Sequence, residues 1–279
     1  MLDLLPPSGQ AARVGDDGEL SRRGLLRGGV GLGLGAAALA AGAAAAGVSY
    51  ADTGAVRHRA FAAKGEPRMP SSTRLLWRAD TDEPVLALTF DDGPDPAYTE
   101  PLLRQLAEQD VRATFFVVGE RGAAHRDLLR REVAAGHELG NHTWRHTDLA
   151  MLSRAETREE LGRTADLIAE VTGAPPAVLR PPWGRISGTA MHIAAEQGLD
   201  VMVWDVRLLE QELDAAGNVR HVLDELQTGM VLLAHDAGPG PRSVGVAAMP
   251  GIIRGARERG FRFVTASEML ALDRTSARR

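Results

Sequence analysis

Leu88-Thr89-Phe90-Asp91-Asp92-Gly93-Pro94 is the stretch of sequence that decides the fold. The apolar run Val85–Phe90 is rich in β-forming residues and ends in two acids followed by Gly-Pro, which predicts a buried strand that stops abruptly. In α/β folds, loops gather and ligands bind at the carboxyl ends of the strands. Two adjacent carboxylates at such an end therefore indicate a chemical site.

The two acids can serve one site only if the strand ends between them. Ideal strand geometry would point Asp91 and Asp92 to opposite faces of the sheet. Gly93 and Pro94 are suitable residues for a turn directly after the strand, so we expect the strand to end at Asp91. Because like charges repel, two carboxylates in one site need a positive group between them, and a metal ion is the simplest one.

The composition is that of an ordinary globular protein. The 279 residues are 44% hydrophobic and 25% charged, which predicts one folded α/β domain. The net charge is −5 and the arginines are scattered, so we expect no nucleic-acid partner. We expect a monomer with no stable protein partner. Cysteine is absent, and any metal must therefore be held by His, Asp or Glu.

The N-terminal region resembles an export signal. Ser21–Arg27 contains a twin-arginine pair, Gly28–Val48 is a Gly/Ala/Leu stretch, and Ser49-Tyr50-Ala51 resembles a cleavage site. We expect residues 1–51 to be a twin-arginine signal peptide, with a transmembrane anchor as the alternative. The protein would then use the twin-arginine export machinery and be secreted or associated with the cell envelope.

Residues 52–80 have the composition of a linker, with a possible short strand at Arg74–Trp77. The domain itself is expected over residues 81–273, followed by a tail at 274–279. From Val85 onward, short apolar runs alternate with amphipathic segments, which is typical of βα units and a parallel sheet. About seven such repeats favour a compact barrel over an open sheet. The expected strands are Val85–Phe90, Ala113–Val118, Glu138–Asn141, Ala177–Arg180, Val201–Val206, Met230–Ala234 and Phe261–Thr265.

A second polar cluster, Asn141–His146, contains two histidines four residues apart. Such histidines lie on one side of a helical turn or close together in a tight loop, so both can reach one ion. With Asp92 from another strand end, His142 and His146 make a two-histidine, one-carboxylate set, which is typical of hydrolytic zinc sites. The alternatives are two surface histidines, or the non-haem iron oxygenases that share this ligand set.

Two further clusters occur at strand ends. In Leu179–Gly184, two prolines and a glycine predict a rigid turn, and Arg180 at its start is a permanent cation that could keep a carboxylate ionised. In Met230–Asp236, strand alternation places Leu233 and His235 on one face. A histidine at the end of an apolar strand face suits a general acid or base.

With these motifs in place, residues 85–272 resemble the polysaccharide deacetylases, carbohydrate esterase family four. The resemblance rests on four motifs in order: Thr89–Pro94, His142–His146, Arg180–Gly184 and Leu233–His235. It implies a distorted, partly open (β/α) barrel that binds one divalent ion, usually Zn²⁺, with Co²⁺, Ni²⁺ or Mn²⁺ possible. It also implies the removal of acetyl groups from amino sugars or, in some members, from O-acetylated xylan.

The resemblance also implies roles for individual residues. The expected metal ligands are Asp92, His142 and His146. The expected catalytic residues are Asp91 as general base, Arg180 as its partner and His235 as the acid for the leaving group. The residues expected to contact the substrate or its oxyanion are Trp183, through its backbone N–H, and Trp204 and Leu233, which line the acetyl pocket.

One position departs from the family pattern. Arg207 stands near the place where an aspartate commonly orients the acid histidine, and Asp205 is the candidate substitute two residues earlier. Our first hypothesis is an exported, metal-dependent deacetylase acting on N-acetylglucosamine units of peptidoglycan or chitin-like polymers. The alternatives are an O-acetyl esterase acting on xylan, and a non-catalytic glycan-binding module that retains the metal site.

Overall fold

The structure, a computed structural model, describes residues 72–274. The predicted signal peptide (1–51), most of the predicted linker (52–80) and the last five residues of the predicted tail lie outside the described residues. Among residues 72–274, no helix combines the length and the apolar character that crossing a lipid bilayer requires.

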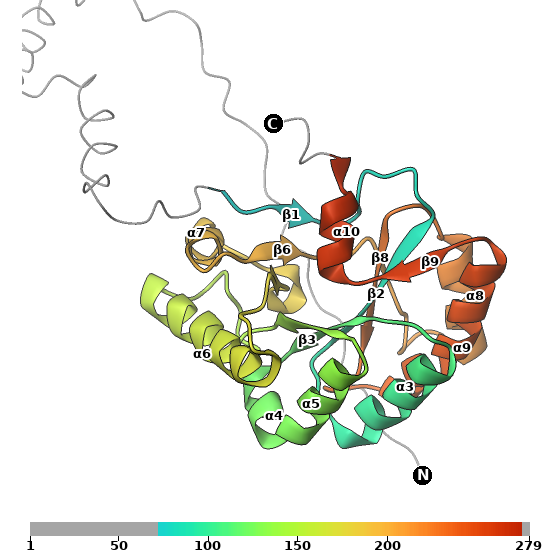
Figure 1. Ribbon diagram of the computed structural model, residues 1–279, viewed down its shortest axis with the longest axis horizontal. Coiled ribbons are helices and arrows are strands. Elements are labelled where there is room, and N and C mark those ends of the chain that lie inside the picture. Colours follow the sequence, from blue (N-terminus) through green and yellow to red (C-terminus); the bar gives the residue numbers. More distant parts are fainter. Residues whose placement is uncertain (1–71, 275–279) are drawn as a thin grey trace, which may run out of the picture. The chain divides into compact units, whose positions relative to one another are not determined.

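One curled parallel sheet forms the centre of the domain (Figure 1). Its hydrogen-bonded order is β1-β6-β5-β4-β3-β2-β8-β7, with β9 paired to β2. Because β1 and β7 are at opposite ends of this order, the barrel is open along one side. The prediction of a partly open α/β barrel is confirmed. The strands are β1 (Leu75–Leu76), β2 (Val85–Asp91), β3 (Thr114–Val117), β4 (Glu138–Asn141), β5 (Val178–Leu179), β6 (Asp200–Met202), β7 (Val206–Arg207), β8 (Met230–His235) and β9 (Arg262–Val264).

The sheet differs in one main place from the predicted strands. The strand expected over Val201–Val206 is divided into β6, which pairs with β1 and β5, and β7, which pairs with β8. The chain between them changes neighbours because it crosses the open side of the barrel. The short strand expected at Arg74–Trp77 is present as β1, and its pairing with β6 makes it part of the sheet although it lies within the range taken for the linker.

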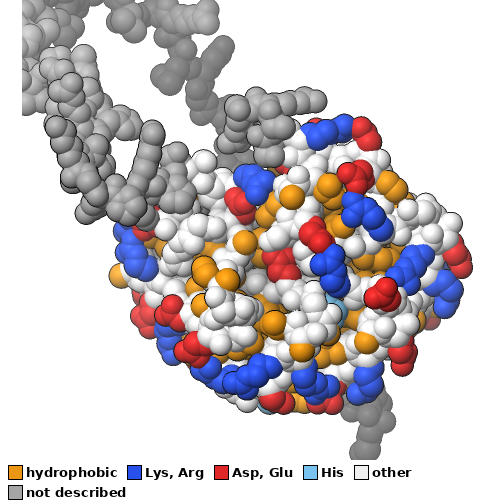
Figure 2. Space-filling view, in the orientation of Figure 1, with side chains coloured by type: hydrophobic (Ala, Val, Ile, Leu, Met, Phe, Trp, Pro, Cys, Tyr) orange, Lys and Arg blue, Asp and Glu red, His pale blue; other side chains and the backbone are white. Residues whose placement is uncertain are grey.

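Helices surround the sheet (Figure 1). They are α3 (Pro96–Glu108), α4 (Gly119–Ala124), α5 (Arg126–Ala134), α6 (Arg154–Thr172), α7 (Gly188–Glu196), α8 (Ala215–Asp224), α9 (Arg242–Glu258) and α10 (Ala266–Leu272). Helix α6 begins with a capping box formed by Ser153 and Glu156, and it ends at Gly173 in the left-handed conformation. On the face shown in Figure 2, acidic and basic side chains are interspersed over the surface.

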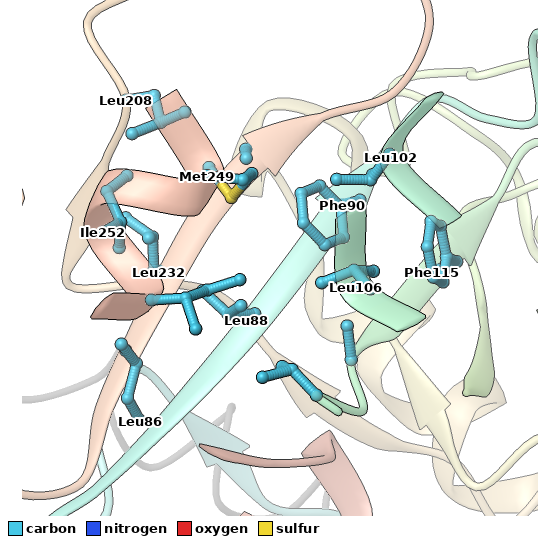
Figure 3. Packing of buried hydrophobic residues seen from close by; sticks show 14 of the residues in the cluster. Leu86, Leu88, Phe90, Leu102, Leu106, Phe115, Leu208, Leu232, Met249 and Ile252 are labelled. Carbon is cyan, nitrogen blue, oxygen red and sulfur yellow. The ribbon is translucent and has the colours of Figure 1, made fainter. Parts of the chain in front are cut away.

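Strand β2 is the centre of the packing, and every one of its residues is buried. Leu86, Leu88 and Phe90 lie on one face of β2, between side chains of α3 and α9 (Figure 3). Phe90 stacks on Phe115 of β3, with ring centroids 5.2 Å apart. These apolar contacts with α3, α9 and β3 hold β2 in place. The position where the strand ends is therefore well determined.

The parallel register brings the functional clusters to one edge. Asp91 at the end of β2 lies opposite His235 at the end of β8. Asn141 at the end of β4 pairs with Leu179 of β5, the residue before Arg180. Because all these strands run in the same direction, their polar end residues share the carboxyl edge of the barrel.

Candidate active site and metal centre

Strand β2 ends at Asp91, and the backbone turns sharply at the next residue. Asp92 has a φ of 76°, in the left-handed region that non-glycine residues seldom occupy. The turn also needs a glycine at position 93, because a Cβ there would lie 2.2 Å from Oδ2 of Asp236. As a result, both Asp91 and Asp92 line the same pocket.

The two histidines of the second motif lie in a tight loop after β4, not on a helix. His146 has a φ of 56°, in the left-handed region. Its ring centroid is 5.0 Å from that of His142, which lies four residues earlier. The loop is held by Glu160 of α6, a buried carboxylate that accepts hydrogen bonds from the backbone N–H groups of Trp144 and Arg145.

The side chains of Asp92, His142 and His146 offer three metal-ligand atoms that all lie within 4.8 Å of one another. Oδ1 of Asp92 is 3.1 Å from Nε2 of His146 and 3.6 Å from Nε2 of His142. Nδ1 of His142 is 2.7 Å from the carbonyl oxygen of Arg180. This contact requires the proton on Nδ1 and leaves the Nε2 lone pair free for a metal. The donor set therefore fits a divalent ion such as zinc.

The charges of this group depend on one another. Burial alone would raise the pKa of Asp92, but hydrogen bonds and charges from His142 and His146 outweigh it and hold that pKa well below its usual range. Asp92 is therefore ionised. An ionised carboxylate is the form that binds a cation, and the site needs no further proton loss from Asp92 to do so.

Arg180 is fully buried and holds Asp91 in place. Its Nη1 donates to Oδ1 of Asp91 at 2.8 Å and to the hydroxyl of Thr89 at 2.7 Å. Its Nε and Nη2 donate to the carbonyl oxygens of Met202 and Val203. Burial lowers the pKa of Arg180, and the charge of Asp91 opposes this effect. Each nitrogen of the guanidinium thus has at least one acceptor, and the group fixes the orientation of one carboxylate oxygen.

His235 is oriented by Glu210, which the sequence analysis missed. Nδ1 of His235 is 3.2 Å from Oε2 of Glu210, and this carboxylate is buried. The same Oε2 accepts a hydrogen bond from Nη1 of Arg242, whose Nη2 lies 3.6 Å from Oδ2 of Asp92. A Cβ on Gly245 would lie 2.2 Å from Oε1 of Glu210, so α9 makes room for the carboxylate by carrying a glycine there.

The expectation that Asp205 substitutes for the orienting aspartate is wrong. Oδ1 of Asp205 accepts a hydrogen bond from the N–H of Val231, and its Oδ2 lies 3.8 Å from Nε of Arg78. Val231 is four residues before His235, which places Asp205 about 13 Å from the histidine along β8. Arg207 lines the pocket and is paired with Glu212 at 3.4 Å.

The three residues expected to contact the substrate all line the pocket. Trp183 has a φ of 55° and is 60% exposed, and its ring centroid lies 4.5 Å from that of His146. Trp204 lies beside Arg180, whose guanidinium carbon is 5.8 Å from its ring centroid. Leu233 is buried. The structure therefore brings all nine site residues named from the sequence to one pocket or, for Arg180, directly beneath it.

A further buried acid lies below the pocket. Asp236 accepts a hydrogen bond from the hydroxyl of Thr99, and burial together with the charge of Asp92 raises its pKa to about 7. Sequence reasoning also missed Glu160 and Arg242. Neither Glu160 nor Arg242 could be identified from a local sequence pattern, because the partners of each come from another element of the fold.

The model of the polysaccharide deacetylase family matches residues 78–202, and this chain belongs to that family. A peptidoglycan-N-acetylglucosamine deacetylase of Bacillus cereus is 34% identical over 199 residues, which cover 70% of this chain and 92% of the relative.

Two further relatives agree with this assignment. The peptidoglycan-N-acetylmuramic acid deacetylase PdaC of Bacillus subtilis is 33% identical over 68% of this chain and 39% of its own length. The crystal structure of a peptidoglycan N-acetylglucosamine deacetylase in complex with 4-naphthalen-1-yl-N-oxidanyl-benzamide has a TM-score of 0.68 and 31% identity. The match covers 70% of this chain and 92% of the chain in that crystal structure.

Proposed function

We propose that the protein is an exported, metal-dependent deacetylase that hydrolyses the N-acetyl groups of glycans and releases acetate. The observation that carries the proposal is the position of Asp91. This carboxylate is held by Arg180, and its Oδ2 is 3.6 Å from Nε2 of His142, next to the three candidate metal ligands. A base beside a metal centre is the arrangement that amide hydrolysis needs.

The substrate class is supported by the relatives. Two of them are named as peptidoglycan deacetylases, one of N-acetylglucosamine and the other of N-acetylmuramic acid. We propose the same class of N-acetylated glycan for this chain, with chitin-like polymers included because they contain the same N-acetylglucosamine unit.

Asp92, His142 and His146 would hold the ion, and we propose Zn²⁺, with Co²⁺, Ni²⁺ or Mn²⁺ as replacements. When bound, such an ion supplies Lewis acidity, which polarises the acetyl carbonyl and makes a water molecule more acidic. Asp91 accepts the proton of the attacking water, and Arg180 keeps its accepting oxygen turned toward the pocket.

His235, at the end of the neighbouring strand β8, completes the reaction by giving a proton to the departing amine, which is otherwise a poor leaving group. Glu210 keeps a proton on Nδ1 of His235, so that Nε2 is the nitrogen that faces the substrate. The backbone N–H of Trp183 is proposed to stabilise the oxyanion. Trp204 and Leu233 are proposed to receive the acetyl methyl group.

The test is acetate release by the full chain from peptidoglycan, chitin oligomers and acetylated xylan. We expect release from the first two, loss of release with a chelator, and recovery on addition of Zn²⁺. The Asp91→Asn variant is the matched control, because it keeps the size of the side chain and removes the base.

The other outcomes identify the alternatives. Release from xylan alone would replace the proposal with an O-acetyl esterase. Glycan binding without acetate from any substrate would replace it with a non-catalytic module.

We also propose export by the twin-arginine route. The support is the sequence of residues 21–51, which lie outside the described residues. The test is cell fractionation of the wild type and an Arg22→Lys, Arg23→Lys variant, with sequencing of the mature N-terminus. Retention of the variant inside the cell, with a wild type that begins after residue 51 outside it, is the expected result. An equal distribution of both proteins would contradict the proposal.

A further inference from the structure

Three arginines line the pocket, and they differ in what they bind. Arg242 is buried against Glu210. Arg121 donates to the carbonyl oxygen of Asp92 at 2.9 Å. Arg207 is different, because its side chain is 50% exposed and its acidic partner, Glu212, is 52% exposed at 3.4 Å. A pair this open to water contributes little, so a ligand can displace it at small cost.

Arg207 is close to the position where the acetyl group would enter. It lies directly opposite Leu233 in the parallel pair of β7 and β8, and both side chains line the pocket. His235 is two residues farther along β8 on the same strand face. With the acetyl methyl group at Leu233, a substituent on the sugar carbon next to the acetamide would occupy the same pocket that Arg207 lines.

A guanidinium has five N–H donors in a planar fork that matches a carboxylate, and most of those of Arg207 are not committed to protein acceptors. N-acetylglucosamine is neutral and has only a hydroxyl group beside the acetamide. N-acetylmuramic acid carries a lactyl ether at that carbon, which ends in a carboxylate or continues into an acidic stem peptide.

We infer that Arg207 is a specificity-determining residue that binds a carboxylate of the glycan next to the reacting acetamide, and so selects muramic-acid-containing strands over neutral ones. This inference rests on the proposed deacetylase function and names its substrate more closely. The carboxylate has two possible sources, the free lactyl group and the stem peptide, and the experiment separates them.

The experiment measures glycan affinity by calorimetry in the full chain carrying Asp91→Asn, so that no turnover occurs. The same titrations on the unmodified chain, kept metal-free by a chelator, guard against an effect of Asp91→Asn itself. Three tetrasaccharides are compared: a chitin oligomer, an alternating strand with free lactyl groups, and the same strand with stem peptides. The quantity of interest is the ratio of the affinity for each acidic strand to the affinity for the chitin oligomer.

We expect this ratio to exceed one and to fall about tenfold in Arg207→Ala, the size of effect typical of a hydrogen bond to a charged group. Arg207→Lys keeps the charge without the fork and should give an intermediate ratio. Arg126→Ala is the matched control, because Arg126 is also a half-exposed arginine in a surface ion pair, with Glu170, and lies outside the pocket. Its ratio should equal that of the parent chain.

A loss seen only with the peptide-bearing strand would assign the carboxylate to the stem peptide, and a loss seen only with the free-lactyl strand would assign it to the lactyl group. A loss with both strands would show that Arg207 binds a carboxylate from either source. An unchanged ratio in Arg207→Ala, or no glycan binding at all, would overturn the inference. Failure of the proposed function is distinguished from this, because absence of acetate release leaves the affinity ratio measurable.

Discussion

The imidazole of His235 is held by the carboxylate of Glu210, with Nδ1 and Oε2 3.2 Å apart. Glu210 follows β7 on the chain and is fixed by Arg242 from α9, a buried residue that also approaches Asp92. One arginine thus lies between the carboxylate that orients the proposed acid and the carboxylate proposed to bind the metal. Arg242 thus connects the proposed proton donor, His235, with the proposed metal site.

The first prediction concerns Glu210. Glu210→Gln removes the charged acceptor of the hydrogen bond from Nδ1–H of His235. Protonation of the leaving amine should therefore suffer, and kcat on N-acetylated glycans should fall about a hundredfold. Hydrolysis of an aryl acetate, whose leaving group needs no proton, should change much less. Asp205→Asn is the control and should leave both rates unchanged. An equal loss on both substrates would indicate a structural role only.

A second prediction uses the close approach of α9 to the same carboxylate. The new Cβ of Gly245→Ala would lie 2.2 Å from Oε1 of Glu210 and should push the carboxylate away from His235. We expect a loss of kcat similar to that of Glu210→Gln. Gly162→Ala in α6 is the control, because no atom comes closer than 4.0 Å to its Cβ, and it should keep full activity. Wild-type kcat in Gly245→Ala would contradict the role given to this contact.

Arg180 provides a test of stability. Arg180→Met leaves Asp91 buried beside a neutral side chain, and breaking a buried ion pair in this way should lower the free energy of unfolding by about 3 kcal/mol or more. The measurement is denaturant unfolding. Arg185→Met removes an exposed arginine paired with Asp148 and should change stability by less than about 0.5 kcal/mol. Similar values for the two variants would argue against the importance of the buried pair.

The metal site predicts a stabilisation that does not depend on catalysis. A ligand that binds only the folded state adds about 2.7 kcal/mol of stability when its concentration is about a hundredfold above its Kd. Zn²⁺ should therefore raise the Tm of the wild type and a chelator should reverse the effect. His146→Ala should lose the shift, whereas His192→Ala, which removes an exposed histidine outside the pocket, should keep it. A shift of equal size in His146→Ala would place the ion elsewhere.

His137 predicts a dependence of stability on pH. Burial, assisted by the charge of Arg112, lowers the pKa of His137 from 6.5 to about 4, and its Nδ1 accepts a hydrogen bond from the N–H of Ala113. Between these two pH values the unfolded chain binds the proton and the folded chain does not. Stability from this residue is therefore present above pH 6.5 and is lost as the pH falls, by about 3 kcal/mol in all.

The check on His137 is the difference in unfolding free energy between the wild type and His137→Gln, which keeps an acceptor but does not titrate. This difference should change in favour of the variant as the pH falls from 6.5 toward 4. Parallel pH curves for the two proteins would contradict the assignment.

Much of the architecture could be predicted from local patterns. The apolar run before Asp91 predicted β2, and the Gly-Pro pair predicted its end, because turn chemistry acts over a few residues. The start of α6 is also encoded locally, because Ser153 and Glu156 form a capping box three residues apart. The division of Val201–Val206 into β6 and β7 was not predictable in this way, since the two halves pair with different distant strands.

The functional site, like the fold, could be predicted only in part from the sequence. The sequence by itself determined which residue types stand at the strand ends, and the order of the motifs was enough to indicate the family. Only the tertiary structure decided that Glu210, and not Asp205, reaches His235. The physical reason is that strand register places Asp205 opposite Val231, while the chain after β7 folds back under α9, where Arg242 and the space at Gly245 receive a carboxylate. Such a contact depends on elements far apart in sequence, and no local pattern records it.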